Sequence, residues 1–240
     1  MSWLRRSGDG PAAPATPTAA SQPAGPLPEI AHSAPGLKQA LERLPRPGAS
    51  VLDLGPPLAQ NVAFFNRLGA RLEVFDLEST LRDERLWVAP AKLAHWRERA
   101  PAALGLGAAA SFDLILVWDL PNYLGRERWP TLAERLVARL AKGGMLHLLA
   151  RTGREMPERP SLFRWVEIDA IREEPRGDER VPAPRFSHGE IEKLHPGLAA
   201  AKSFLDKHGL QEFLLEHADE LKLPPRAVAE LRKPRSHYPG

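Results

Sequence analysis

The segment between residues 51 and 69 constrains the fold of this chain most, because strand, turn and helix signals follow one another there without a spare residue. The run Val51-Leu52-Asp53-Leu54 is apolar around one acid, which is typical of a buried central strand. Gly55-Pro56-Pro57 ends that strand, and Pro57 suits the first position of a helix. Apolar residues then recur at helical spacing as far as Gly69, namely Leu58, Val62 and Phe65.

Strand and helix signals continue to alternate along the chain, which predicts βαβ units and a mainly parallel sheet. Helices are expected at residues 37–44 and from Pro130 to Gly143-Gly144, where the glycine pair ends the second of them. Strands are expected at residues 71–77, 112–118 and 145–150. The segment DLPNYLG after residue 118 has the composition of a turn, and we expect a third strand within residues 79–110.

The chain divides into one domain, residues 34–220, and two tails. Residues 1–28 hold six prolines and six alanines among Gly, Ser and Thr, a composition that buries too little apolar surface to offset the entropy of ordering. We therefore expect a disordered tail over residues 1–30 and a second tail over residues 221–240. Within the domain, residues 151–185 are rich in Arg, Glu and Pro, which indicates an insertion over one end of the sheet.

Three local patterns complete the order of elements. The run 163–171 within the insertion is predicted to be one strand. Ser187, with Glu190 three residues later, predicts a capped helix, whose hydrophobic staple would join Phe186 and Ile191. The last apolar runs are predicted to form an antiparallel hairpin, with strands at residues 198–205 and 210–217.

The composition excludes several classes of protein. Without cysteine the chain has no disulfide framework or thiol nucleophile, and no other set of ligands has metal-binding spacing, so we predict no metal site. A net charge of +3, from 33 basic and 30 acidic residues, does not indicate nucleic-acid binding. No signal-peptide core and no run of about 18 apolar residues occurs, so we expect a cytoplasmic protein without a membrane partner.

Two acids mark the predicted ligand-binding edge of the sheet. Ligands of open parallel sheets bind beyond the carboxyl ends of the strands, where helix N-termini present free N–H groups. Asp53 and Gly55 end the first strand, and Asp76 follows 23 residues after Asp53 near the end of the second. That spacing is typical of a cofactor-binding turn and an acid that accepts hydrogen bonds from a ribose.

Together, VLDLG, RLEVFDL, FDLILVWDL, KGGMLHLLA and the final hairpin resemble class I S-adenosylmethionine-dependent methyltransferases. The resemblance covers residues 45–217. It implies a Rossmann-like α/β fold with a mainly parallel seven-stranded sheet, an antiparallel C-terminal hairpin, and S-adenosyl-L-methionine as cofactor.

The resemblance also assigns roles to positions of this chain. The first loop, Asp53 to Gly55, would hold the methionine part of the cofactor, and Asp76 would hold the ribose. Leu58 would add a helix-start N–H and Asn61 a side-chain amide. Three residues after the fourth strand would face the transferred methyl group and act as catalytic residues, namely Asp119, Asn122 and Tyr123.

Two departures from the family pattern bear on cofactor affinity. The family loop runs Asp-x-Gly-x-Gly-x-Gly, whereas here Pro57 and Ala59 stand where the family has its later glycines. Prolines lack an N–H, and side chains keep the backbone away from a ligand, so weaker binding is expected. Residues 107–111 also lack the acid that the family often places near the adenine amino group.

The predicted function is therefore methyl transfer by direct displacement to an unidentified substrate. Arginines of the insertion suggest an acidic substrate or partner: Arg151, Arg154, Arg159 and Arg164. One alternative is a methyltransferase-like binding protein that has lost turnover, which the altered loop favours. Another is a nicotinamide-dependent oxidoreductase, which the terminal hairpin disfavours. The sequence is silent on oligomeric state.

Overall fold

A mixed six-stranded sheet forms the centre of the computed structural model, which describes residues 28–45, 47–87, 92–105 and 111–218. The strand order is β10-β11-β5-β4-β2-β3. In chain order the strands are β2 (Ser50–Asp53), β3 (Arg71–Val74), β4 (Phe112–Trp118), β5 (Leu140–Arg151), β10 (Leu198–Leu205) and β11 (Leu210–His217). The first four run parallel, while β11 is antiparallel to both β5 and β10. The predicted α/β fold and its closing hairpin are thereby confirmed.

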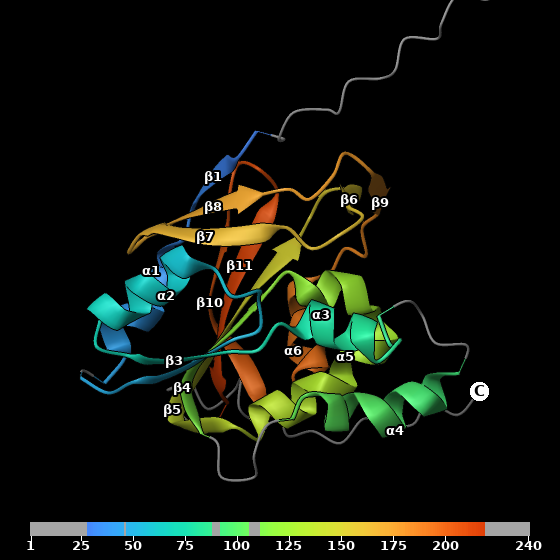
Figure 1. Cartoon of the computed structure of the whole chain (residues 1–240), viewed down its shortest axis with the longest axis horizontal. Coiled ribbons are helices and arrows are strands. Elements are labelled where there is room, and N and C mark those ends of the chain that lie inside the picture. Colours follow the sequence, from blue (N-terminus) through green and yellow to red (C-terminus); the bar gives the residue numbers. More distant parts are fainter. Residues whose placement is uncertain (1–27, 46, 88–91, 106–110, 219–240) are drawn as a thin grey trace, which may run out of the picture.

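Helices cover both faces of this sheet, as Figure 1 shows. The helices are α1 (Pro35–Arg43), α2 (Ala59–Arg67), α3 (Leu77–Asp83), α4 (Leu93–Ala103), α5 (Leu120–Val137) and α6 (His188–Leu194). Helices α1 and α2 pack on one face, and their buried residues share a cluster with Leu114, Leu116 and Trp118 of β4. Helices α3 to α6 pack on the other face, against Ile115 and Val117. The alternating side chains of β4 therefore serve two cores.

Two small sheets lie beside the main one and contain most of the predicted insertion. The first has the order β1-β8-β7, with strands β1 (Ile30–Ser33), β7 (Leu162–Glu167) and β8 (Ala170–Glu174), all antiparallel. The second pairs β6 (Glu155–Pro157) with β9 (Arg180–Pro182). Figure 1 places β1, β8 and β7 at one end of the molecule, above α1 and α2. The N-terminal strand thus joins the insertion and not the main sheet.

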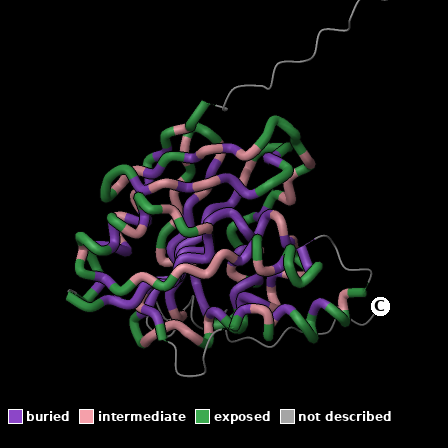
Figure 2. Tube along the Cα trace, in the orientation of Figure 1, coloured by how far each residue is buried: buried purple, intermediate pink, exposed green. Residues whose placement is uncertain are grey.

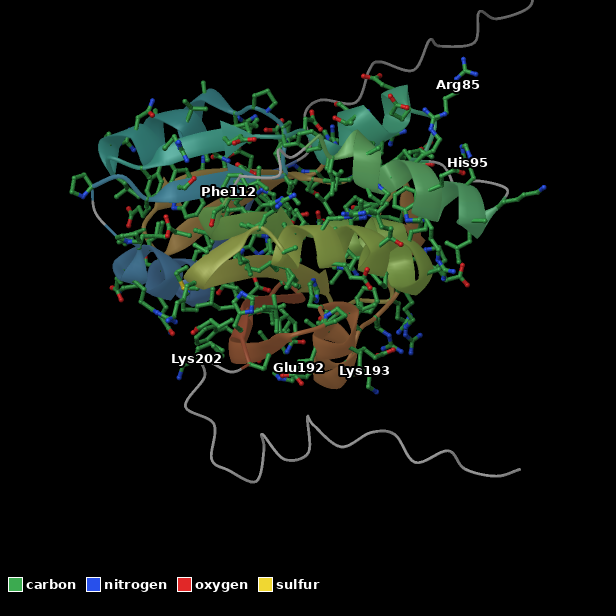
Figure 3. The ribbon with its side chains drawn as sticks, turned by 90° about the horizontal axis from the view of Figure 1, so that it is seen from below. Arg85, His95, Phe112, Glu192, Lys193 and Lys202 are labelled. Atoms are coloured by element: carbon green, nitrogen blue, oxygen red, sulfur yellow. The ribbon has the colours of Figure 1, made fainter. Side chains whose placement is uncertain are left out.

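Burial follows this arrangement. Figure 2 shows the buried residues concentrated in the central strands, with exposed residues on the outer turns and helix faces. In Figure 3, Phe112 at the start of β4 lies inside the molecule, whereas Arg85, His95 and Lys202 lie at its outside. Phe112 is 1% exposed. The capping box of Ser187 and Glu190 is present at the start of α6, as predicted.

The sheet has six strands among the described residues, so the prediction of seven is wrong for this part of the chain. The described parts of residues 79–110 form α3 and α4 and hold no strand, which also removes the predicted third strand there. The helices form because the apolar residues that contact the core recur at helical spacing, as Leu77 and Leu81 do in α3.

The segment DLPNYLG is not a turn but the first part of α5. Pro121 is tolerated there because the first turn of a helix needs no proline N–H. The helix is interrupted at Gly125, whose φ of 68° and ψ of −176° suit only glycine. Helical residues resume directly after Gly125, so Pro130 lies inside α5 and does not open it. Gly143-Gly144 belongs to β5 and does not end a helix.

Three boundaries also differ from the sequence prediction. Residues 163–171 form a hairpin of β7 and β8, because the apolar alternation continues across a turn at residues 168–169. Helix α2 begins at Ala59 after Leu58, so Pro57 lies before the helix. Ile30, predicted to lie in the tail, is the first residue of β1, while residues 1–27 of that tail lie outside the described residues.

Candidate functional site

All five residues predicted to bind a cofactor line one cavity of about 370 Å³ at the carboxyl ends of β2 and β4. These residues are Asp53, Gly55, Leu58, Asn61 and Asp76. Of the three predicted catalytic residues, Asp119 lines the same cavity. The insertion completes the wall with Pro160, Ser161, Phe163 and Arg176. The cavity is narrow in this conformation, with room for about one water.

Asp53 is a buried carboxylate held from two sides. Its Oδ1 accepts the backbone N–H of Gly55 at 2.9 Å and the indole N–H of Trp118 at 2.6 Å. Burial raises the pKa of Asp53 to about 6, although hydrogen bonds from Trp118, Gly55 and Asn61 partly oppose the rise. A carboxyl group with this pKa changes its charge close to neutral pH.

Trp118 shapes the floor of the loop that follows β2. A Cβ atom at Gly55 would lie 2.9 Å from Nε1 of Trp118, so only glycine fits above the indole. Trp118 itself has a φ of 55°, which is unusual for a bulky residue. Its ring stacks on Phe163 of β7 with centroids 5.3 Å apart and an interplanar angle of 7°. The one remaining glycine of the motif is therefore required by the indole beneath it.

Asp76 lies at the N-cap of α3. Its Oδ1 accepts the backbone N–H of Ser79 at 3.0 Å, and its Oδ2 accepts the Ser79 hydroxyl at 2.8 Å. The side chain is partly exposed. Because a carboxylate offers about four lone-pair positions, Asp76 keeps capacity to accept further hydrogen bonds from a ligand in the cavity.

Asn61 holds the insertion. Its amide Nδ2 donates to the carbonyl of Phe163 at 3.0 Å, and its Oδ1 accepts the backbone N–H of Trp165 at 2.9 Å. The neighbouring Gln60 also donates to the carbonyl of Trp165, at 2.5 Å. Side chains of helix α2 thereby pair with the backbone of strand β7.

Glu78 was missed by sequence reasoning, yet it holds the insertion over the cavity. This buried carboxylate accepts Nε of Arg82 at 2.8 Å, from its own helix. It also pairs with Arg176 and lies 3.6 Å from Nη2 of Arg159, both in the insertion. The sequence carries no local signal of this cluster, because Arg176 lies 98 residues from Glu78.

Asp119 is paired with an arginine. Its Oδ2 accepts Nη2 of Arg151 at 2.6 Å and Nε at 2.9 Å. Burial raises the pKa of Asp119, while the charge of Arg151 opposes the rise. Arg151 also donates to Glu173 of β8 at 2.7 Å. Asp119 therefore forms part of a buried ionic network that joins β5 to the insertion.

Asn122 and Tyr123 also bind the insertion and its neighbours. The Asn122 side chain donates to the Pro184 carbonyl at 3.1 Å and accepts the Arg151 N–H at 3.1 Å. The Tyr123 hydroxyl lies 3.1 Å from the Pro157 carbonyl and 3.0 Å from the Arg159 carbonyl. Burial raises the pKa of Tyr123 far above its ordinary value, so its phenol stays protonated. Both residues line a second, more open cleft and not the narrow cavity.

The arginines that suggested an acidic partner are largely engaged within the chain. Arg151 pairs with Asp119 and Glu173, Arg159 lies against Glu78, and Arg164 pairs with Glu174 at 2.5 Å. Among the described residues, no group of three or more His, Asp or Glu side chains is arranged to hold a metal ion. In the same part of the chain, no helix is both long and apolar enough to span a membrane.

Comparison with known proteins gives structural similarity only. No family model matches the sequence, and no curated protein matches it. Among solved structures, the 1,6-didemethyltoxoflavin-N1-methyltransferase of Burkholderia thailandensis, with 1,6-didemethyltoxoflavin and S-adenosylhomocysteine bound, is 19% identical with a TM-score of 0.41. The match covers 75% of this chain and 76% of that one.

Two further structures are similar at the same level. An S-adenosylmethionine-dependent methyltransferase of Clostridium acetobutylicum is 14% identical with a TM-score of 0.44, covering 78% of this chain and 92% of its own. DesVI of Streptomyces venezuelae is 15% identical with a TM-score of 0.44, covering 76% and 89%. At these TM-scores the fold assignment depends on the strand order itself, a parallel α/β sheet closed by an antiparallel hairpin.

Proposed function

We propose that this chain is an S-adenosylmethionine-dependent methyltransferase with an unidentified methyl acceptor. One observation supports it most: the turn after β2 and the acid after β3, far apart in sequence, line the same cavity at the carboxyl edge of the sheet. In this proposal Asp76 accepts hydrogen bonds from the ribose hydroxyls, and Asp53 and Gly55 lie beside the methionine part. The strand order, with its antiparallel end, also disfavours a nicotinamide-dependent oxidoreductase.

The donor and acceptor groups of the cavity fit such a ligand, whereas its present size does not. Asp76 offers a partly exposed carboxylate, and the cavity also reaches the carboxylate of Asp53. However, the insertion leaves room for about one water. Binding of a nucleoside-sized cofactor therefore requires the insertion to move, which includes opening the contacts of Glu78 with Arg159 and Arg176.

Bound S-adenosylmethionine would supply an electrophilic methyl group. The residues of this chain would position the acceptor and exclude water, with Asp119 and Leu120 on the cavity wall nearest to the start of α5. Because Asp119 is paired with Arg151, it is poorly placed to remove a proton in this conformation. An acceptor whose nucleophile needs no strong base, such as a neutral amine, suits this site better than an alcohol.

A second candidate function is binding of the cofactor without transfer. It is favoured by the contacts of the three predicted catalytic residues, since Asp119, Asn122 and Tyr123 all hold the insertion or its neighbours. The two functions share the ligand and differ in turnover. To separate them, the chain is incubated with S-adenosylmethionine and a panel of primary amines, alcohols and thiols, and the formation of S-adenosylhomocysteine is measured by chromatography.

Isothermal titration of the full chain with S-adenosylmethionine, S-adenosylhomocysteine and NAD tests the shared part of the proposal. Asp76→Asn keeps an N-cap for α3 and removes the charge, so S-adenosylmethionine and S-adenosylhomocysteine should bind about 5–100-fold more weakly. Asp83→Asn is the matched control, because Asp83 is an exposed acid at the other end of α3. Binding of NAD alone, or equal affinity of both variants and the parent, would refute the ribose assignment.

A further inference from the structure

His32 of β1 is a buried histidine between two carboxylates from distant parts of the chain. It is 4% exposed. Its Nε2 lies 2.9 Å from Oε2 of Glu173 on the adjacent strand β8, and its Nδ1 contacts Oδ2 of Asp206 in the turn between β10 and β11. One imidazole ring therefore joins three segments: the N-terminal strand, the insertion and the hairpin of the main sheet.

Both carboxylates are fixed by other contacts. Oε1 of Glu173 accepts the hydroxyl of Ser161 at 2.7 Å and Nη2 of Arg151 at 2.7 Å. Oδ1 of Asp206 accepts the backbone N–H groups of the turn, from His208 at 2.8 Å and from Leu210 at 2.9 Å. Because the two acids are anchored, the distances to His32 are set by the fold.

This geometry selects the protonation state of His32. A neutral imidazole has one N–H donor and one lone pair, whereas an imidazolium has two donors. With an ionised carboxylate at each ring nitrogen, the neutral ring would direct its lone pair at negative oxygen atoms. Only the imidazolium satisfies both contacts.

The charged groups around the ring act in the same direction. Burial alone lowers the pKa of His32, but hydrogen bonds and charges from Glu173 and Asp206 outweigh it and raise the pKa above 6.5. The ring of His208 lies nearly perpendicular to that of His32, with the ring centroids 5.4 Å apart. Glu212 of β11 lines the cavity of about 540 Å³ next to His32. Burial raises the pKa of Glu173, but the hydrogen bond from His32 and the charge of Arg151 outweigh burial and lower the pKa to about 2.

We propose that His32 is a pH-sensitive clasp, which ties strand β1 to the insertion and the hairpin while protonated and releases the strand when it loses its proton. The adjoining cavity, lined by His32, Asp206 and Glu212, lets water reach the ring when one contact opens. Because Arg151 is shared between Glu173 and Asp119, the clasp also connects to the wall of the candidate site. The proposal does not depend on the proposed function.

The direction of the pH effect follows from linkage. The folded pKa of His32 is raised, so its contribution to stability is fully present below pH 6.5 and is lost as the pH rises through the folded pKa. The depressed pKa values of Glu173 and Asp206 give contributions that are lost only in acid, as the pH falls through their folded pKa values. Strand β1 should therefore be held most firmly in weakly acidic solution.

Two measurements on the full chain test the clasp. In protein labelled with ¹⁵N-histidine, the ring resonances that disappear in His32→Gln should titrate with a midpoint above 6.5. Amide hydrogen exchange of residues 30–33, corrected for the intrinsic base-catalysed rate, should rise at least about tenfold through that midpoint. His188→Gln, at a half-exposed histidine, is the control and should leave both readouts unchanged.

Asp206→Asn keeps the test decisive where His32→Gln fails to fold. Asparagine still accepts the two turn amides through its side-chain oxygen but removes one charge from the ring, so the midpoint of His32 should fall and β1 should exchange faster at pH 6. A His32 midpoint at or below 6.5 in the parent protein, or β1 exchange that follows the intrinsic rate alone, would overturn the proposal.

Discussion

The loop after β2 and the first turns of α5 lie at the same edge of the sheet, yet they differ in what their polar atoms contact. Six of the residues from Asp53 to Asn61 line the narrow cavity together with Asp76. In α5, Asn122 and Tyr123 donate to backbone carbonyl groups of the insertion, those of Pro184, Pro157 and Arg159. Position at the carboxyl edge therefore makes a residue a site candidate, and its partners decide whether it is available to a ligand.

The insertion creates this difference. It covers both regions, but over the loop it contributes a wall, with Phe163 and Arg176, while over α5 it takes up the hydrogen bonds of the side chains themselves. Asn61 shares features of both regions, since it lines the cavity and also pairs with the backbone of β7. A substitution of Asn61 would therefore disturb the packing of the insertion as well as any ligand contact.

The largest effect should come from the ionic network on the α5 side. Arg151→Met leaves Asp119 and Glu173 buried without their shared cation, so the free energy of unfolding should fall by about 3–5 kcal/mol. Urea unfolding measures the loss. Arg164→Met breaks a more exposed pair with Glu174 and should cost less than about 1 kcal/mol. Similar losses in the two variants would show that the buried network stabilises the fold no more than an exposed ion pair does.

On the loop side, the predicted effect depends on pH. Asp53 has a folded pKa of about 6 against an ordinary value of 3.8, so the folded protein holds this proton more tightly and loses stability as the pH rises between these values. Asp53→Asn should remove that loss and raise the stability at pH 7 relative to pH 4 by up to about 3 kcal/mol.

Unfolding of Asp53→Asn and of the parent across pH 4–7 tests this prediction, with Asp83→Asn as the exposed control. If the free energy of unfolding depends on pH equally in the parent protein and in Asp53→Asn, the raised pKa of Asp53 is contradicted.

The smallest effect concerns the space above Trp118. Gly55→Ala places a Cβ atom 2.9 Å from the indole Nε1, so the loop or the ring must shift at a cost of about 1–3 kcal/mol. Trp118→Phe removes that nitrogen, so the added methyl group should cost less in the double variant than in the parent. Calorimetry of the four proteins gives the coupling energy. Strict additivity would mean that Gly55 is not required by the indole.

Local patterns predicted the regular half of the molecule well. Strand β4 and the two strands of the hairpin have the bounds expected from the sequence, because each is an apolar run bounded by turn residues. The capping box of Ser187 was equally readable, since all its atoms lie within four residues. The error over Asp119 to Gly125 arose because Pro, Asn and Gly suit both a turn and a kinked helix start.

Long-range pairing was out of reach of the sequence. His32 lies 141 residues from Glu173, and Asn61 lies 102 residues from the carbonyl of Phe163. Such contacts depend on how the insertion folds back, and no residue spacing indicates that. For the candidate site, the sequence therefore identified part of the cavity lining, but neither Glu78 nor the insertion residues that narrow the cavity.

The indole below the first loop has a consequence for how this sequence can vary. In a loop shaped by its ligand, each glycine is needed because a small molecule comes close to the backbone. Here Gly55 is needed for a further reason, because the indole of Trp118 on the neighbouring strand lies against its backbone. Asp53, Gly55 and Trp118 form one packing unit within the protein itself, so the need for glycine at position 55 does not extend to positions 57 and 59.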